Sequence, residues 1–205
     1  MQKVLKVIMI LLFVSGLGLV GYSVYQITDG ANKVQEKTAE AKDLINEAGY
    51  NSKGQPKDVD WSKIDVDSLS FDKGETMGIL YVPKLDKEIP IVEGTDPDEL
   101  ELGVGHYTGT ALPLQKDQIV LSGHRDTVFR NFDQLKIGDS FVVQLPYGSF
   151  EYKIYETEIV SADDTTVIRS TAPDEILTVT TCYPFYFLGN APDRFIFYAK
   201  PVYEN

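Results

Sequence analysis

An unbroken apolar run opens the chain. Residues 7–25 (VIMILLFVSGLGLVGYSVY) contain no charged side chain. At about 1.5 Å per helical residue, such a run nearly crosses a hydrocarbon core of about 30 Å. Lys3 and Lys6 precede the run, and Asp29 is the first acid after it. The positive charge on the amino-terminal side predicts a cytoplasmic N-terminus and an extracellular remainder.

The same run is also compatible with a cleaved signal peptide, because Ser15, Gly16 and Gly18 are small. No A-x-A pattern follows it directly, and the stretch is long for a signal. We therefore expect residues 1–28 to form a cytoplasmic tip and an uncleaved transmembrane helix.

Residues 29–74 are expected to form an extracellular stalk helix and a linker. Residues 31–48 are rich in Ala, Glu and Lys, which is typical of a helix. The apolar positions of this helix form a thin stripe: Val34, Ala41, Leu44 and Ile45. Such a helix is either solvated or loosely docked. Residues 49–73 lack periodicity, which indicates a linker. Four apolar residues could let the linker lie against the folded body: Trp61, Ile64, Val66 and Leu69.

From residue 75 to 205, short runs rich in Val, Ile, Tyr and Phe alternate with turn residues, a pattern typical of an all-β sandwich or barrel. The strands are predicted at Met77–Val82, Glu88–Val92, Gln118–Ser122, Ser140–Leu145, Phe150–Val160, Glu175–Thr181 and Phe195–Val202. Short helical turns are predicted at residues 96–102 and 128–134, and a hairpin loop at 146–149.

Composition narrows the functional classes. A chain of 205 residues, 43% hydrophobic and 24% charged, suits one folded domain with an appendage. Its net charge of -12 disfavours a nucleic-acid partner, which would need a surplus of Lys and Arg.

Cysteine and histidine are scarce. Cys182 is the only cysteine, so it is either a buried apolar side chain or a reactive thiol. His106 and His124 are the only histidines, and a structural zinc site would need four Cys or His ligands. We expect no metal and no cofactor, although the many acidic residues leave a dependence on calcium open. No D-x-D-x-D-G loop is present, and the acidic segment 93–101 reads as a solvated turn.

Cys182 and His124 each end a predicted strand. Pro184 stops the ladder two residues after Cys182, which places the thiol near a rim of the sheet. Gly123 permits an unusual backbone angle or a close approach beside His124. Two strand ends can meet at one rim and unite a nucleophile with its base. Taken alone, however, His124 is more typical of a hydrogen-bonded loop histidine.

Arg194 starts the next predicted strand, twelve residues after Cys182. On an adjacent antiparallel strand it could pair with the thiolate or stabilise an oxyanion. On spacing alone, a surface arginine is the more usual reading. His106 is expected to serve packing or a turn.

The order of these segments resembles the sortase family. Residues 178–182 (TVTTC) are similar to the family's T-L-x-T-C signature, with Val179 in place of Leu, a change that should leave the strand intact. Residues 122–127 (SGHRDT) resemble its histidine segment, and residues 193–196 (DRFI) resemble the segment with its essential arginine. Residues 105–113 (GHYTGTALP) look like the stretch before the histidine strand.

The resemblance spans roughly residues 75–203 and implies a closed β-barrel of about eight strands with short helices. It implies a membrane-tethered cysteine transpeptidase of Gram-positive surfaces, which cleaves an LPxTG-like sorting signal after Thr. Cys182 would form a thioacyl enzyme, His124 would act as acid and base, and Arg194 would steady the oxyanion. The partners would be surface proteins bearing the signal and a peptidoglycan precursor amine. Ser122 and Thr180 each precede a catalytic residue by two positions, so they should share its face and line the substrate groove.

Within the family, residues 182–187 (CYPFYF) and the compact size are most similar to class D enzymes. Pilus-building class C enzymes usually carry a D-P-W/F lid motif and often a second anchor at the C-terminus. Here Asp60-Trp61 lacks the Pro, and no apolar tail precedes Asn205. A housekeeping or spore-associated anchoring role is favoured over pilus assembly.

Two other functions fit the residues. A surface domain could bind a peptide or carbohydrate without catalysis, with the Cys, His and Arg set as a remnant. A plain cysteine protease would resolve the acyl enzyme with water in place of an amine.

Overall fold

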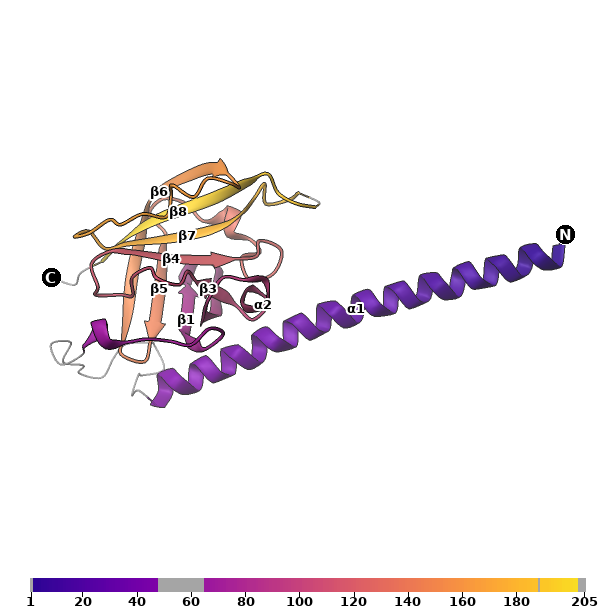
Figure 1. Ribbon diagram of the computed structural model, residues 1–205, viewed down its shortest axis with the longest axis horizontal. Helices are drawn as coiled ribbons and strands as arrows, with labels where there is room; N and C mark the ends of the chain where they lie inside the picture. The colour runs from indigo at the N-terminus through magenta and orange to yellow at the C-terminus, as the bar shows by residue number, and fades with distance from the viewer. Residues whose placement is uncertain (1, 48–64, 188, 203–205) are drawn as a thin grey trace.

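The computed structural model describes residues 2–47, 65–187 and 189–202, and the short predicted runs form strands in it (Figure 1). The strands are β1 (Thr76–Val82), β2 (Lys87–Glu93), β3 (Val104–His106), β4 (Gln118–Gly123), β5 (Ser140–Leu145), β6 (Gly148–Ser161), β7 (Ile176–Tyr183) and β8 (Asp193–Pro201).

These strands close into a barrel in the order β1-β2-β3-β4-β7-β8-β6-β5, and β5 pairs with β1 to complete the ring. The pairs β2–β3 and β4–β7 are parallel, and the other pairs are antiparallel. The expected closed all-β barrel is confirmed. The seven predicted strands are present with ends shifted by up to two residues, and β3 was not predicted.

Alternation along the strands separates a core face from an outer face. On β5 the burial alternates between half-buried and buried residues, and Phe141, Val143 and Leu145 point into the core. The core is mostly aliphatic and contains a cluster of aromatic rings. Phe141 and Phe197 contact edge to face with centroids 5.8 Å apart, and Phe132 joins both.

The connections are short. The helical turns predicted at residues 96–102 and 128–134 contain α2 (Pro97–Leu100) and the 3-10 turn Phe132–Gln134. The predicted hairpin is tighter than expected, because Leu145 pairs with Gly148 and leaves only Pro146 and Tyr147 as the loop. Two further 3-10 turns are found at Val66–Ser68 and Pro83–Leu85.

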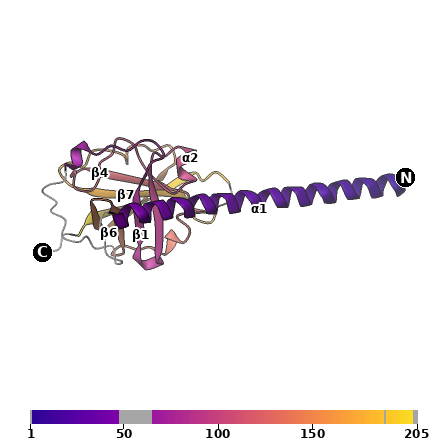
Figure 2. The same cartoon turned by 90° about the horizontal axis from the view of Figure 1, so that it is seen from below.

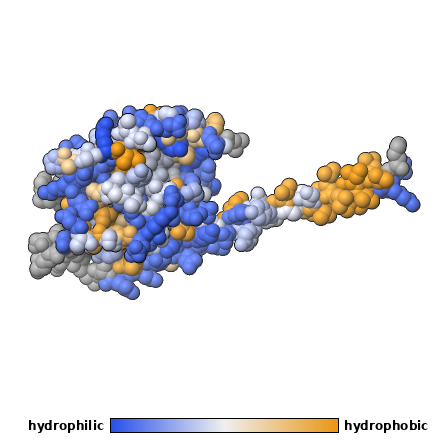
Figure 3. All heavy atoms as spheres, viewed as in Figure 1, coloured by the Kyte–Doolittle hydropathy of each residue, from blue (hydrophilic) through white to orange (hydrophobic). Residues whose placement is uncertain are grey.

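The apolar run and the expected stalk are one continuous helix, α1 (Gln2–Glu47). Its amino-terminal half projects away from the barrel, with apolar side chains exposed all round (Figure 1, Figure 3). This helix is long and apolar enough to cross a membrane. The sequence separated two helices around Asp29 and Gly30. Because no proline interrupts the pair and one glycine costs only about 1 kcal/mol, the helix continues through them.

The second half of α1 docks on the barrel. Ala41 and Ile45, one helical turn apart, are buried against Ile79 on β1. Lys37 Nζ donates to Thr76 Oγ1 at 3.1 Å, and Lys42 pairs with Glu88 on β2. The stripe foreseen from the sequence therefore packs against β1 and β2 (Figure 2). In the linker, Val66 and Leu69 pack against the core, whereas Trp61 and Ile64 lie outside the described residues.

Candidate active site

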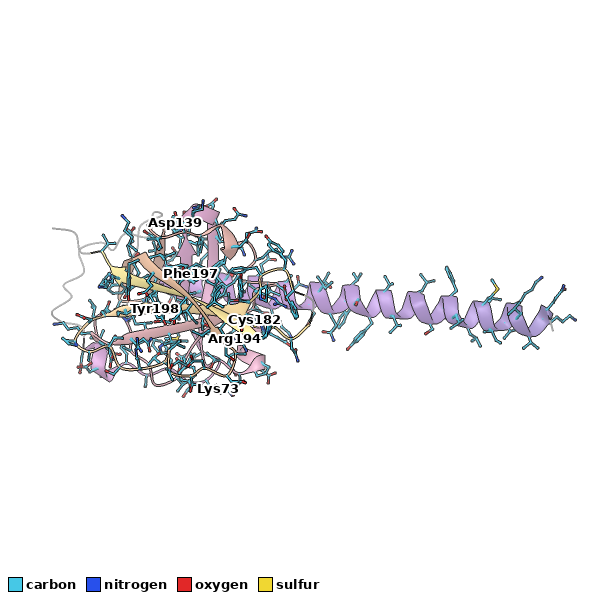
Figure 4. The ribbon with its side chains drawn as sticks, turned by 90° about the horizontal axis from the view of Figure 1, so that it is seen from above. Lys73, Asp139, Cys182, Arg194, Phe197 and Tyr198 are labelled. Carbon is cyan, nitrogen blue, oxygen red and sulfur yellow. The ribbon has the colours of Figure 1, made fainter. Side chains whose placement is uncertain are left out.

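The β7–β8 ladder brings Cys182 and Arg194 face to face. They are direct partners in the antiparallel register, so their side chains project from the same side of the sheet. Figure 4 shows the two labelled residues side by side, toward the end of the barrel from which α1 extends. The twelve-residue spacing between Cys182 and Arg194 therefore covers the last residue of β7, the β7–β8 loop and the first residue of β8.

The parallel β4–β7 pair brings His124 to the same rim. Gly123 pairs with Thr181, and Thr181 Oγ1 also donates to the Gly123 carbonyl at 2.8 Å. His124 follows directly, beside Cys182. A Cβ at position 123 would come within 2.7 Å of the buried Phe129 ring, which explains the glycine by close approach.

The outer face of β4, β7 and β8 forms the floor of a groove of about 350 Å³. Strand alternation places six groove residues on this face: Ser122, His124, Thr178, Thr180, Cys182 and Arg194. Cys182 and His124 are each half-buried, so both can be reached from the groove. All five residues singled out from the sequence are therefore brought together.

Loops wall the groove on both sides. Thr95, Leu100 and Tyr107 lie on one side, and Val167 and Ile168 of the β6–β7 loop lie on the other. Among the residues that line the groove, Asp164, His124 and Arg194 are the ones with acidic or basic side chains. The groove therefore suits a peptide of mostly aliphatic and hydroxyl-bearing residues.

The β6–β7 wall is fastened to the start of β4. Gln118, 4% exposed, donates to the Val167 carbonyl at 2.8 Å and accepts from the Arg169 N–H at 2.8 Å. Asp117 accepts from the Thr171 N–H at 2.6 Å and from the Ala172 N–H at 3.1 Å. These bonds fix the loop that carries Val167 and Ile168. No local sequence pattern predicts this role of Asp117 and Gln118.

Arg194 is held at the strand start by main-chain oxygens. Its Nη1 donates to the Asp193 carbonyl at 3.0 Å and to the Ala191 carbonyl at 3.4 Å. A guanidinium carries five N–H donors in a fixed plane, so a group anchored through Nη1 can still present donors to a ligand.

Arg125, next to His124, was missed by the sequence analysis. Its side chain is 5% exposed and donates to three carbonyls of the β7–β8 loop. The acceptors are the carbonyls of Pro184 at 2.8 Å, Phe187 at 2.5 Å and Gly189 at 3.0 Å. Arg125 thus ties the histidine segment to the loop that joins Cys182 to Arg194. An arginine in a loop is usually solvated, so its sequence position carries no signal of this burial.

His106 has a different setting and does not line the groove. It is 4% exposed, and its Nδ1 lies 2.6 Å from Glu93 Oε2. Its Nε2 lies 3.1 Å from the Ala111 carbonyl and from Thr110 Oγ1, whose own proton goes to the Tyr107 carbonyl. Both ring nitrogens therefore have a polar partner, so the buried ring is held on one side by the Glu93 carboxylate and on the other by the Ala111 carbonyl and the Thr110 hydroxyl.

The pairing with His106 changes the pKa of Glu93. Burial opposes ionisation of this carboxyl, but hydrogen bonds from His106 and Thr108 outweigh burial and lower the pKa of Glu93 below its ordinary value. The His106–Glu93 pair joins β3 to β2, where the two residues are register partners. This is the packing role expected for His106.

The arrangement can perform nucleophilic acyl transfer. A thiol, an imidazole and a guanidinium converge on one groove, which supplies a nucleophile, a proton carrier and an oxyanion donor. Within the described residues, no three Cys, His, Asp or Glu side chains are clustered so as to hold a metal ion.

Comparison with known proteins agrees with this geometry. The family model described as "Sortase domain" matches residues 80–202. This chain belongs to the sortase family. Members of this family are cysteine transpeptidases, and the chain has a thiol in the expected strand.

Individual sortases extend the comparison. The chain is 44% identical to Sortase D of Bacillus subtilis, over 96% of this chain and 98% of that protein. It is 27% identical to Sortase A of Bacillus anthracis over 88% of both chains. A solved Sortase D5 transpeptidase of Clostridium perfringens superposes with a TM-score of 0.66 at 25% identity, over 83% of this chain and 99% of that one. The predicted similarity to class D sortases is thereby supported.

Proposed function

We propose that this sortase cleaves an LPxTG-like sorting signal after its Thr and joins the surface protein to a cell-wall amine. The observation that carries the proposal is the register of β7 and β8, which sets Cys182 opposite Arg194 in the groove that His124 also lines.

In the proposed reaction, the Cys182 thiolate attacks the threonine carbonyl and the electron pair moves onto the carbonyl oxygen. Arg194 donates hydrogen bonds to this oxyanion. As the C–N bond breaks, His124 gives its proton to the departing amine and a thioester remains on Cys182. An incoming amine then attacks the thioester and loses its proton to His124, and the thiolate is released.

The groove supports a substrate of this kind. Val167 and Ile168 offer an apolar wall for aliphatic residues of a sorting signal. We propose that Ser122 and Thr180, register partners on the groove floor, hydrogen-bond the bound peptide near the scissile bond.

We also propose that α1 crosses the cell membrane once. Lys3 and Lys6 on its amino-terminal side favour a cytoplasmic N-terminus and an extracellular barrel. Protease added to intact protoplasts should then digest the barrel and spare an epitope tag at the N-terminus. Protection of the barrel would reject this topology.

The proposed chemistry needs no metal, because side chains supply the nucleophile, the proton carrier and the oxyanion donor. Three acidic residues of segment 93–101 are already paired: Glu93 with His106, Asp96 with Lys73 and Glu101 with Lys33. Asp164, which lines the groove, accepts from the Thr166 N–H and hydroxyl. We predict that EDTA or added calcium changes kcat/KM by less than twofold. A larger effect of calcium, reversed by chelation, would contradict this.

The test of function incubates the full chain with an LPxTG-type peptide, with and without an amine such as triglycine or diaminopimelate. A new amide product formed only with the amine supports transpeptidation. Free acid as the sole product in both tubes indicates a protease. No turnover, together with unchanged peptide binding in Cys182→Ala, indicates a binding domain. A lysine-bearing pilin peptide as the preferred acceptor would favour pilin polymerisation.

A further inference from the structure

The β7–β8 loop carries an exposed aromatic surface that catalysis does not use. Tyr186 is 84% exposed and Phe187 is 42% exposed. Residues 184–192 (PFYFLGNAP) contain no acidic or basic side chain, in a chain that is 24% charged with a net charge of -12. The loop therefore forms an uncharged, aromatic surface patch on an acidic protein, and exposed apolar patches of this kind often mark interaction sites.

The aromatic rings are held outward by bonds on the inner side of the loop. The buried Arg125 guanidinium binds the carbonyls of Pro184, Phe187 and Gly189. The Tyr186 hydroxyl donates to Asp133 at 2.8 Å, which fixes the direction of that ring. Three of the loop's main-chain oxygens are thus bound by Arg125, whose guanidinium also lies 6.0 Å from the Phe187 ring centroid, and the Tyr186 ring and part of the Phe187 ring remain exposed.

The loop projects from the end of the barrel toward which the amino-terminal half of α1 extends, in both ribbon views (Figure 1, Figure 2). Contacts between α1 and the barrel also place the catalytic end of the barrel near the apolar run. Lys33 of α1 binds Glu101 at 3.2 Å, and Glu101 precedes β3, which pairs with Ser122 at the catalytic end of β4. The catalytic end is thus the end of the barrel close to the apolar run.

The distance to the apolar run is short. Asp29 bonds to Lys33 one turn away, and Tyr25 ends the apolar run of residues 7–25. The four residues from Asp29 to Tyr25 advance the helix by about 6 Å. This rise is similar to the headgroup layer on one side of a bilayer, roughly 5–8 Å. A loop that extends beyond the barrel toward the run would therefore enter that layer.

We propose that the β7–β8 loop is a second membrane contact, in which the Tyr186 and Phe187 rings lie in the headgroup region of the bilayer that α1 crosses. Aromatic side chains favour this region, because an apolar ring and a polar edge are both accommodated there. The loop has no acidic residue of its own to be repelled by anionic lipids, although its Tyr186 hydroxyl binds the neighbouring Asp133 carboxylate. This inference rests on the proposed anchoring of α1. The loop contact would hold the groove at the membrane surface, where the enzyme would encounter a membrane-held substrate.

The experiment places a nitroxide spin label at position 187 of the full chain. Cys182→Ala removes the only native thiol, and Phe187→Cys supplies a single labelling site. Val202→Cys is the matched control, because Val202 is 43% exposed and lies beyond the opposite end of β8. Tyr186→Cys gives a second site in the loop. The labelled proteins are reconstituted in vesicles of phosphatidylglycerol and phosphatidylethanolamine.

The collision rates of the spin label with oxygen and with a water-soluble nickel complex then report how deep the label lies in the bilayer. We expect the oxygen-to-nickel ratio at positions 186 and 187 to exceed that at position 202 at least threefold. Equal ratios at all three positions would overturn the proposal. So would slowed label motion without a gain in oxygen collisions, since this would indicate a protein contact. Alkaline carbonate extraction separates the two claims: retention on vesicles upholds the anchor whatever the loop does, and release overturns both.

Discussion

In the proposed reaction, Arg194 stabilises the negative charge of the oxyanion. Its position is set by the register between β7 and β8. Strand pairing sets it opposite Cys182, and the carbonyls of Asp193 and Ala191 orient its guanidinium. An oxyanion donor acts only when negative charge develops, so its loss should appear in kcat.

We predict that Arg194→Ala lowers kcat about 10²- to 10³-fold with little change in KM. Arg194→Lys should recover only part of the rate, because an ammonium cannot reproduce the planar fork. Steady-state kinetics with a sorting peptide test this. Arg130→Ala, an exposed arginine outside the groove, is the control and should retain the wild-type rate. A change in KM alone would make Arg194 a substrate-binding residue.

Arg125 positions the β7–β8 loop, which joins Cys182 to Arg194. We predict that Arg125→Lys lowers the free energy of unfolding by on the order of 3 kcal/mol, because bonds from a buried charged donor to main-chain carbonyls are lost. The altered loop joins Cys182 to Arg194, so kcat should also fall at least tenfold. Urea unfolding and kinetics at a temperature well below unfolding measure the two effects.

A purely structural role for Arg125 would leave the folded enzyme unchanged. The pH profile of Cys182 alkylation by iodoacetamide distinguishes the cases. We expect the profile of Arg125→Lys to shift, because the loop between Cys182 and Arg194 is no longer fixed. An unaltered profile in the folded variant would show that Arg125 contributes stability only.

At the scale of elements, the His106–Glu93 pair joins β2 to β3, the shortest strand. The pKa of Glu93 is lowered in the folded protein, so the folded state binds fewer protons than the unfolded state as the carboxyl titrates. Its stabilisation is therefore full above the ordinary Glu pKa of about 4.3, and it is lost as the pH falls through the lowered value.

Glu93→Gln should accordingly destabilise the protein by about 1–3 kcal/mol at pH 7, because His106 loses its charged partner. The difference between variant and wild type should shrink as the pH falls below about 4.3. Urea unfolding of the full chain in detergent between pH 3 and 7 provides the comparison. A difference that stayed constant over this range would exclude the carboxylate as the source.

The elements were predictable to different degrees. Alternation over six or more residues located β5 and β6, whereas β3 consists of Val-Gly-His and is too short to show a period. Two-residue alternation also placed Ser122 and Thr180 on the groove face. The burial of Arg125 and the bonds of Gln118 to the β6–β7 loop depend on contacts between segments 49 to 64 residues apart, which no local pattern encodes.

At the scale of the whole molecule, one helix serves two environments. Its apolar half suits a membrane, and its second half packs Ala41 and Ile45 on the barrel. Because the helix is continuous, the orientation of the barrel relative to the apolar run is set by this docking. The β7–β8 loop and the groove residues Cys182 and Arg194 then lie at the end of the barrel from which the apolar half of α1 extends (Figure 1, Figure 4).

The central claim is that Cys182 forms a thioester with the threonine of a sorting signal. Intact-mass spectrometry of the full chain, trapped with an LPxTG-type peptide in the absence of an amine, measures this directly. The account predicts a mass increase equal to the peptide acid that ends at Thr less one water, lost on adding hydroxylamine and absent in Cys182→Ala. His106→Gln should be less stable yet still form the adduct, whereas His124→Ala should not accumulate it. An adduct that persisted in Cys182→Ala, or peptide cleavage that continued in that variant, would contradict the account.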